Sequence, residues 1–86
     1  MIEEEAFYGC TSLSAAVMKK KTARIESKAF ANCTNLRCVK LPKNVVEIAP
    51  DAFEGCENAV FYCPEDSYAE QYAKQYGFKV VNMDQF

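Results

Sequence analysis

A period of 23 residues constrains the fold of this chain more than any other feature. Phe7, Phe30 and Phe53 lie 23 positions apart. Three further columns keep this interval, namely Ile2, Ile25 and Ile48; Ala6, Ala29 and Ala52; and Cys10, Cys33 and Cys56. A unit of this length cannot bury its apolar face alone, whereas stacked units bury identical columns against one another. The period therefore predicts stacked layers in which the phenylalanines lie over each other in one continuous core.

The middle copy, residues 26–48, shows the pattern of one unit most completely, as ESKAFANCTNLRCVKLPKNVVEI. Spacings of three at Phe30, Cys33 and Leu36 favour a helical turn, and alternation at Val39 and Leu41 favours a strand. A proline ends this strand, and a second short extended piece follows it. The predicted fold is an α/β solenoid in a single domain, 1–86, with repeats at about 3–25, 26–48 and 49–63.

The segment 64–82 departs from the repeat and is predicted to be a C-terminal cap. Either Asp66 or Ser67 suits the N-cap of a helix. One apolar stripe follows with helical spacing, formed by Ala69, Tyr72, Ala73 and Tyr76. Gly77 suits the end of the helix, and Phe78, Val80 and Val81 suit a last extended piece. We expect the helix to cover the open end of the final repeat, because stacked repeats need terminal caps.

The repeat resembles the BspA-like leucine-rich repeat family over about residues 2–63. The pattern that carries the resemblance is I-x-x-x-AF-x-x-C-x-x-L-x-x-V-x-LP-x-x-V-x-x-I, which is fullest in the middle copy. The first copy departs from it at residues 18–23 (MKKKTA), and the third has Ala59 in place of leucine. The segment CPEDSYAEQYAKQYGFKVV is similar to the closing segment of such arrays. The resemblance implies a leucine-rich repeat solenoid of three 23-residue repeats closed by a helix.

Five cysteines and no histidine limit the chemistry of the chain. Cys10, Cys33 and Cys56 occupy a repeat column and are expected to pack as buried thiols. Cys38 and Cys63 are expected to lie diagonally, ~8 Å apart, beyond the reach of a disulfide. Free thiols are therefore expected, although a secreted parent protein leaves a disulfide framework open. Without histidine or a C-x-x-C motif, we expect no metal site and no cofactor.

Charge and motifs argue against most other functions. The net charge of −2 gives no general attraction to nucleic acid, and no glycine-rich phosphate loop is present. Without histidine the usual neutral-pH base is missing, so no enzymatic activity is expected. The basic residues Lys19, Lys20, Lys21 and Arg24 suit a solvated connector, with a phosphate or acidic-partner contact as the alternative. No apolar run is long enough to insert in a membrane, and the N-terminus does not resemble a signal peptide.

One face of the predicted strands is a candidate protein-contact surface. If Val39 and Leu41 point into the core, Cys38 and Lys40 point outward. The positions expected beside them are Ala15, Val17, Phe61 and Cys63. A contiguous apolar patch of this kind favours a contact surface. Three strands would offer only ~240 Å², against the ~800 Å² that each partner contributes to a standard interface.

The resemblance implies a non-enzymatic protein-binding module from a bacterial surface or secreted adhesion-type protein. Its partner would be a host, matrix or microbial surface protein, and its location would be extracellular or on the cell surface. The alternative is a structural block that caps a longer solenoid or assembles with itself and has no ligand of its own. An uncovered first repeat exposes strand groups, so a homo-oligomer through the N-terminal repeat is also expected.

Overall fold

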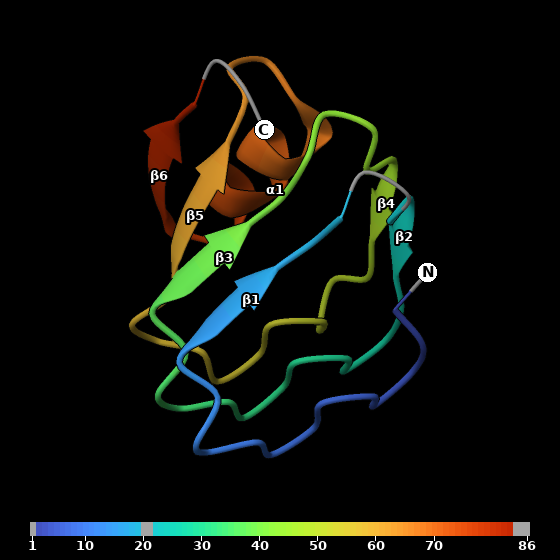
Figure 1. Ribbon diagram of the computed structural model, residues 1–86, viewed down its shortest axis with the longest axis vertical. Coiled ribbons are helices and arrows are strands. Elements are labelled where there is room, and N and C mark those ends of the chain that lie inside the picture. Colours follow the sequence, from blue (N-terminus) through green and yellow to red (C-terminus); the bar gives the residue numbers. More distant parts are fainter. Residues whose placement is uncertain (1, 20–21, 84–86) are drawn as a thin grey trace.

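Two parallel sheets form the frame of the molecule (Figure 1). The computed structural model describes residues 2–19 and 22–83. The larger sheet has the strand order β1-β3-β5-β6 and contains β1 (Ala15–Val17), β3 (Cys38–Lys40), β5 (Val60–Cys63) and β6 (Lys79–Asn82). The smaller sheet pairs β2 (Arg24–Ile25) with β4 (Glu47–Ile48), and Ile2 extends it by one bridge to Ile25. Parallel strands with one helix, α1 (Tyr68–Gln75), confirm the predicted α/β class.

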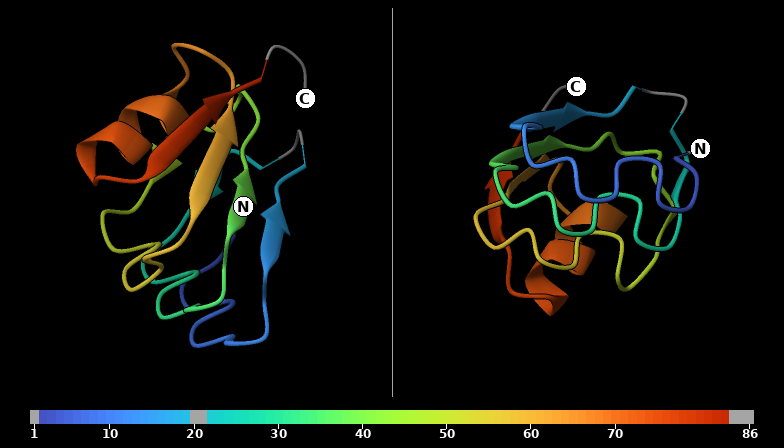
Figure 2. Two further views of the ribbon diagram at one scale, coloured as in Figure 1. Left: turned by 90° about the vertical axis from the view of Figure 1, so that its left-hand side faces the viewer. Right: turned by 90° about the horizontal axis from the view of Figure 1, so that it is seen from below.

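Three rows of turns connect the sheets and lie over one another. We call residues 4–9, 27–32 and 50–55 the turn rows. Their backbone hydrogen bonds run from each row to the next, from Phe7 N–H to the Ala29 carbonyl (2.7 Å) and from Phe30 N–H to the Ala52 carbonyl (2.8 Å). The right-hand view of Figure 2 shows these rows as successive zigzags. The N–H groups of each row donate to the carbonyls of the next row in the sequence. The carbonyls of each row accept hydrogen bonds from the row before it.

The expected helical turn within each copy takes a different form. Residues 26–36 form successive turns closed between positions i and i+3, for example from Cys33 N–H to the Phe30 carbonyl at 3.3 Å. Lys28 and Asn32 have left-handed backbones, with φ of +56° and +60°, and these values interrupt a right-handed helix. Alternate N–H groups are also used between rows. Both features replace a helical segment with a flat zigzag, so this part of the prediction was wrong.

The phenylalanine column forms the centre of the core. The rings of Phe7 and Phe30 lie parallel with their centroids 5.0 Å apart, and those of Phe30 and Phe53 lie parallel at 5.1 Å. Phe30 and Phe53 are almost completely buried, whereas Phe7 at the end of the column is 38% exposed. The expectation that these three rings stack is confirmed. The column continues toward the C-terminus through Phe61, whose ring meets that of Phe53 edge-on at 5.0 Å.

The C-terminal segment folds as predicted up to its last strand. Ser67 is the N-cap of α1, and its hydroxyl accepts a hydrogen bond from Glu70 N–H at 3.2 Å. Gly77 follows the helix with φ of +80°, which suits glycine. The apolar stripe buries Ala69, Tyr72 and Ala73, while its last member, Tyr76, is exposed. The left-hand view of Figure 2 shows α1 beside the β6 end of the large sheet.

Strand β6 is an element whose partner the sequence did not reveal. The segment was expected to be extended, but it also joins β5 in parallel, with Val60 opposite Lys79 and Tyr62 opposite Val81. Because α1 connects β5 to β6, the last connection is a strand–helix–strand crossover of the type that parallel strands require. The crossover extends the large sheet to four strands and places α1 against the core.

Candidate functional site

The outer surface of the large sheet presents two rows of side chains. We call this surface the strand face. In the strand register, the first row contains Ala15, Cys38, Val60 and Lys79, and the second contains Val17, Lys40, Tyr62 and Val81. The residues between these rows, Ala16, Val39 and Phe61, are buried. The strand face therefore contains four of the six residues predicted for it, which are Ala15, Val17, Cys38 and Lys40.

The other two predicted residues of this face, Phe61 and Cys63, lie in the core. Both side chains are completely buried, and Phe61 is opposite Val39 in the sheet. The third copy is one residue shorter before its strand, and in a strand a shift of one residue exchanges the two faces. Val60 and Tyr62 take the outward positions instead. The sequence holds a signal for this shift, because Pro64 follows Pro42 by 22 residues rather than 23.

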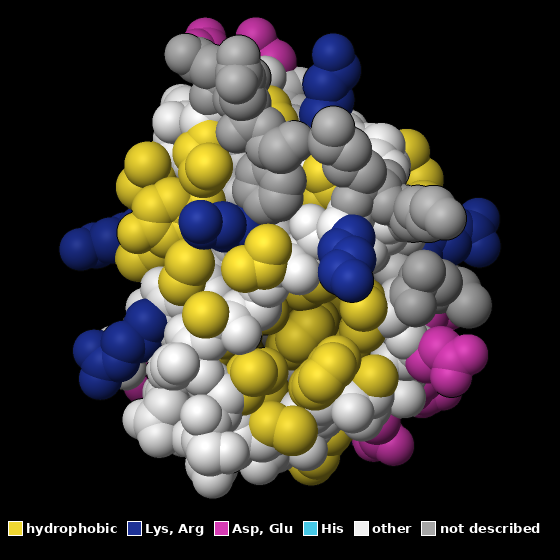
Figure 3. Space-filling model, viewed as in Figure 1, with side chains coloured by type: hydrophobic (Ala, Val, Ile, Leu, Met, Phe, Trp, Pro, Cys, Tyr) yellow, Lys and Arg dark blue, Asp and Glu magenta, His cyan; other side chains and the backbone are white. Residues whose placement is uncertain are grey.

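The strand face carries positive charge on an apolar background. Lys40 and Lys79 are its charged residues, and no aspartate or glutamate lies on β1, β3, β5 or β6. Figure 3 shows hydrophobic and basic side chains over the strands, with acidic side chains toward the edges of the view. In the described parts of the chain, ion pairs join Arg24 to Glu47 (3.4 Å) and Lys74 to Glu70 (3.7 Å). Neither pair involves a residue of the strand face.

The predicted basic cluster is only partly within the described residues. Lys20 and Lys21 lie outside them. Lys19 is exposed, and Arg24 is engaged on β2 by its ion pair with Glu47 of β4. Arg24 therefore lies in a strand of the small sheet and not in the predicted connector, so this part of the prediction was wrong.

The first turn row leaves an open apolar end. Phe7 is 38% exposed, Tyr8 48% and Val17 59%. A hollow of about 210 Å³ lies beside them, and its lining includes Ile2 and Leu13. In the second row the carbonyls of residues 27, 29 and 31 accept N–H groups of the first row. The equivalent carbonyls of residues 4, 6 and 8 accept no backbone hydrogen bond from any described residue.

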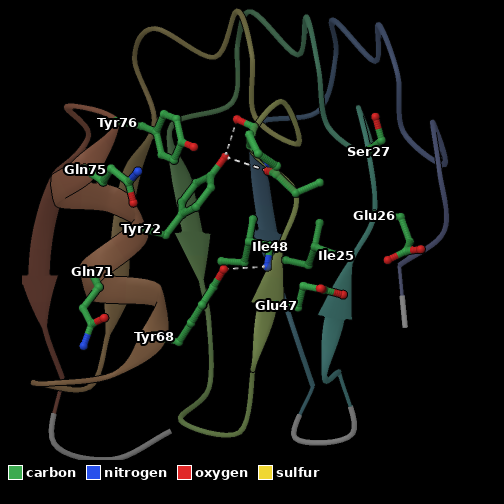
Figure 4. Close-up of a pocket in the computed structure, with 12 residues that line it drawn as sticks. Ile25, Glu26, Ser27, Glu47, Ile48, Tyr68, Gln71, Tyr72, Gln75 and Tyr76 are labelled. Atoms are coloured by element: carbon green, nitrogen blue, oxygen red, sulfur yellow. Dashed lines mark hydrogen bonds between the residues drawn. The ribbon is translucent and has the colours of Figure 1, made fainter.

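The edge of the small sheet that faces α1 is closed by tyrosine hydroxyls. Figure 4 shows a groove of about 490 Å³ between α1 and the β2–β4 sheet. The Tyr68 hydroxyl accepts a hydrogen bond from Ile48 N–H at 3.4 Å. The Tyr72 hydroxyl lies 3.2 Å from the carbonyl oxygens of both Ala49 and Pro50 and donates to them. The Tyr68 hydroxyl thus occupies the edge of β4 that faces away from β2, and the Tyr72 hydroxyl ties α1 to the two residues that follow β4.

The buried thiols and the buried Tyr72 hydroxyl keep their protons at neutral pH. Burial raises the pKa of Tyr72, and it raises the pKa of Cys56 to about 11. Burial also raises the pKa of Cys33 and of Cys63. The thiolate is the form that attacks substrates or binds metals, so these three thiols are poorly suited to either role. A hydrogen bond from the Asn82 amide is the main cause of a lowered pKa at Glu70.

Neither a metal-binding cluster nor a membrane-spanning helix is found among the described residues. Residues 2–19 and 22–83 contain no group of three or more acidic or cysteine side chains placed to hold a metal ion. Within the same residues, no helix has the length and apolar character needed to cross a membrane.

Replacing Tyr72 by phenylalanine is expected to lower the free energy of unfolding by about 1–2 kcal/mol, because two carbonyls lose their donor. The raised pKa of Tyr72 makes the contribution of this residue to the free energy of unfolding depend on pH. The tyrosine stabilises the fold fully below its unfolded pKa of about 10, and this contribution is lost as the pH rises toward the folded value. Urea unfolding below and above about pH 10 should therefore show a smaller alkaline loss in Tyr72→Phe. Tyr76→Phe, at an exposed position of the same helix, should change little; equal effects of both variants would contradict the capping role.

Comparison with known proteins gives one match. A family model described as "BspA type Leucine rich repeat region (6 copies)" matches residues 1–84. No curated protein and no solved structure matches the chain significantly.

Proposed function

Because the chain belongs to the BspA-type leucine-rich repeat family, we propose that it is a non-enzymatic protein-binding module of a bacterial surface or secreted adhesion-type protein. The proposal includes its architecture, a solenoid of three 23-residue repeats with a C-terminal cap at 64–82. It also includes its location, outside the cell or on its surface, and a host, matrix or microbial surface protein as partner. The parallel sheets and stacked phenylalanines support the architecture.

The single observation that carries the proposed function is the composition of the strand face. Val17, Val60, Tyr62 and Val81 give it an apolar surface, and within the described chain no other element packs over it. Contiguous exposed apolar surface is typical of contact sites. Four strands at ~4.8 Å spacing, with about four residues each, cover about 250 Å². A standard interface takes ~800 Å² per partner, so we expect weak binding by this chain and stronger binding when further repeats extend the face.

The test compares two substitutions that add the same charge to different surfaces. Tyr62→Glu places a carboxylate at the centre of the strand face. Val46→Glu places one at an exposed valine outside the large sheet, where the side chain is 63% accessible. Binding to a panel of purified matrix and microbial surface proteins should fall at least tenfold in Tyr62→Glu and stay unchanged in Val46→Glu. Equal binding by both variants, with folding confirmed by circular dichroism, would refute the strand face as the contact site.

A second candidate function is assembly, either as the capping block of a longer solenoid or as a homo-oligomer through the N-terminal repeat. The open first turn row favours it, since Phe7 and Tyr8 are exposed beside carbonyls to which no described backbone N–H donates. Light scattering over a wide concentration range distinguishes the candidates. A concentration-dependent mass that Phe7→Glu abolishes supports self-assembly, whereas a constant monomer mass argues against the homo-oligomer.

A further inference from the structure

The charge of the strand face is the opposite of the charge of the chain. The whole chain has twelve acidic and ten basic residues and a net charge of −2. The eight outward positions of the strand face include two lysines and no carboxylate. The acidic residues of the described chain lie instead in the turn rows, on β4, on α1 and in the loops that join these elements. A local positive surface on an acidic chain favours a partner of the opposite charge.

The two lysines have defined positions within the apolar surface. Lys40 lies between Val17 and Tyr62 in the second row of the strand face. Lys40 is half-buried, as expected for a lysine whose aliphatic stem packs on its neighbours while the ammonium group reaches solvent. Lys79 lies on the edge strand beside Val60. Neither ammonium forms an ion pair with a described residue, so both are available to a ligand.

The strand register sets the distance between these charges. Lys40 and Lys79 are two strands apart, ~9.6 Å, and two residues apart along the strands, ~6.6 Å. Their backbone positions are therefore separated by ~12 Å. Val60 and Tyr62 lie on the strand between them. A complementary ligand has two carboxylates at this separation, with apolar side chains between them. Four residues of extended chain span ~13 Å, and two turns of helix span ~11 Å.

We infer that the strand face binds an acidic–aliphatic segment of a partner protein, in which two carboxylates flank apolar side chains and pair with Lys40 and Lys79. This inference rests on the proposed protein-binding function and specifies the partner's chemistry. Nucleic acid fits the face less well. Single strands are bound by basic grooves with several stacking aromatic rings, whereas this face has two cations and one aromatic residue, Tyr62.

The experiment uses three synthetic peptides and the full chain, of which only the protein carries the ¹⁵N label. The first peptide has the sequence Ser-Glu-Thr-Val-Thr-Glu-Ser, in which the valine and both glutamates share one face of the extended chain; the second has glutamine and the third has lysine in place of both glutamates. Each is titrated into ¹⁵N-labelled protein, and amide shifts are followed by NMR, which detects weak binding and locates it. We expect saturable shifts in β3, β5 and β6 with the glutamate peptide. We expect binding to be about fivefold weaker with the glutamine peptide and absent with the lysine peptide, and to weaken with added salt.

Three charge-reversal variants provide the controls. Lys40→Glu and Lys79→Glu should each weaken binding of the glutamate peptide by about fivefold or more. Lys43→Glu changes the net charge equally at an exposed position outside the strands and should have no effect. Equal affinity for the glutamate and glutamine peptides, or no saturable shift on the strand face, would overturn the inference. Tighter binding of a single-stranded oligonucleotide at the same amides would also overturn it.

The proposed function can fail separately. It depends on whether Tyr62→Glu impairs binding to a whole protein, whatever the charge of that protein. If Tyr62→Glu removes protein binding while the glutamine peptide binds as well as the glutamate peptide, the contact face stands and the acidic preference is wrong.

Discussion

Replacing Phe53 by alanine should lower the free energy of unfolding by about 3–5 kcal/mol, which is a large part of the stability of a small domain. Phe53 is 1% exposed, and its ring contacts those of Phe30, Phe61, Tyr72 and Phe78. It is thus the point at which the stacked column meets α1 and the C-terminal strands of the large sheet. Truncation removes apolar burial on both sides and leaves a cavity that neighbouring layers cannot fill. Urea denaturation followed by circular dichroism measures the loss.

The same column supplies a matched control. Phe7 repeats the position of Phe53 at the open end, where it is 38% exposed and stacks, among the described rings, on Phe30 alone. Phe7→Ala should therefore cost much less, about 1 kcal/mol. Because Phe53→Ala could unfold the chain completely, Phe53→Leu provides a measurable intermediate, with an expected loss of about 1–2 kcal/mol. Equal losses for Phe7→Ala and Phe53→Ala would show that the column does not connect the turn rows to α1.

Replacing Gly55 by alanine is expected to lower the free energy of unfolding by about 2–3 kcal/mol. Gly55 has φ of +82°, a conformation that costs a residue with a Cβ about 1–2 kcal/mol. A Cβ at this position would also lie 2.5 Å from Oδ1 of Asn32 and 3.3 Å from the backbone of that residue in the preceding turn row. The substitution therefore combines backbone strain with a clash between layers.

Two variants separate the strain from the clash. Gly9 occupies the equivalent position of the first row, with φ of +68°, and a Cβ there would have no described atom within 4 Å. Gly9→Ala should show the backbone cost alone, about 1–2 kcal/mol. Adding Asn32→Gly to Gly55→Ala removes the side chain that clashes and should recover part of the loss. If Gly9→Ala and Gly55→Ala are equally destabilising in thermal unfolding, the contact between layers contributes nothing.

Features with local signals were predictable from the sequence. The 23-residue period identified the phenylalanine column because stacking places identical residues in identical surroundings. The end of α1 followed from Gly77, and its start was predicted at either Asp66 or Ser67, of which Ser67 is the N-cap. Both signals act within a few residues or repeat at a fixed interval, so they do not depend on knowing the rest of the fold.

Features that depend on pairing between distant segments were not predictable in the same way. Each strand is two to four residues long, so its side-chain pattern alone does not specify its register. Phe61 and Cys63 were therefore placed on the wrong face, because one residue fewer in the third copy exchanges inward and outward positions. The parallel pairing of β6 depends on how α1 packs, and the zigzag turns depend on hydrogen bonds to the next row.

The one-way hydrogen bonding of the turn rows gives the structure a polarity. Each row matches a translated copy of itself, since its donors meet the acceptors of the row that follows. It does not match a rotated copy, because two first rows placed face to face would present carbonyls to carbonyls. Two first rows related by a two-fold axis would therefore have to associate through side chains such as Phe7 and Tyr8, without backbone hydrogen bonds between the rows. The same asymmetry allows the array to be extended by a duplicated segment 26–48. The carbonyls of the inserted row would accept N–H groups from the row before it, and its own N–H groups would donate to the row after it. Both ends of the array would stay unchanged.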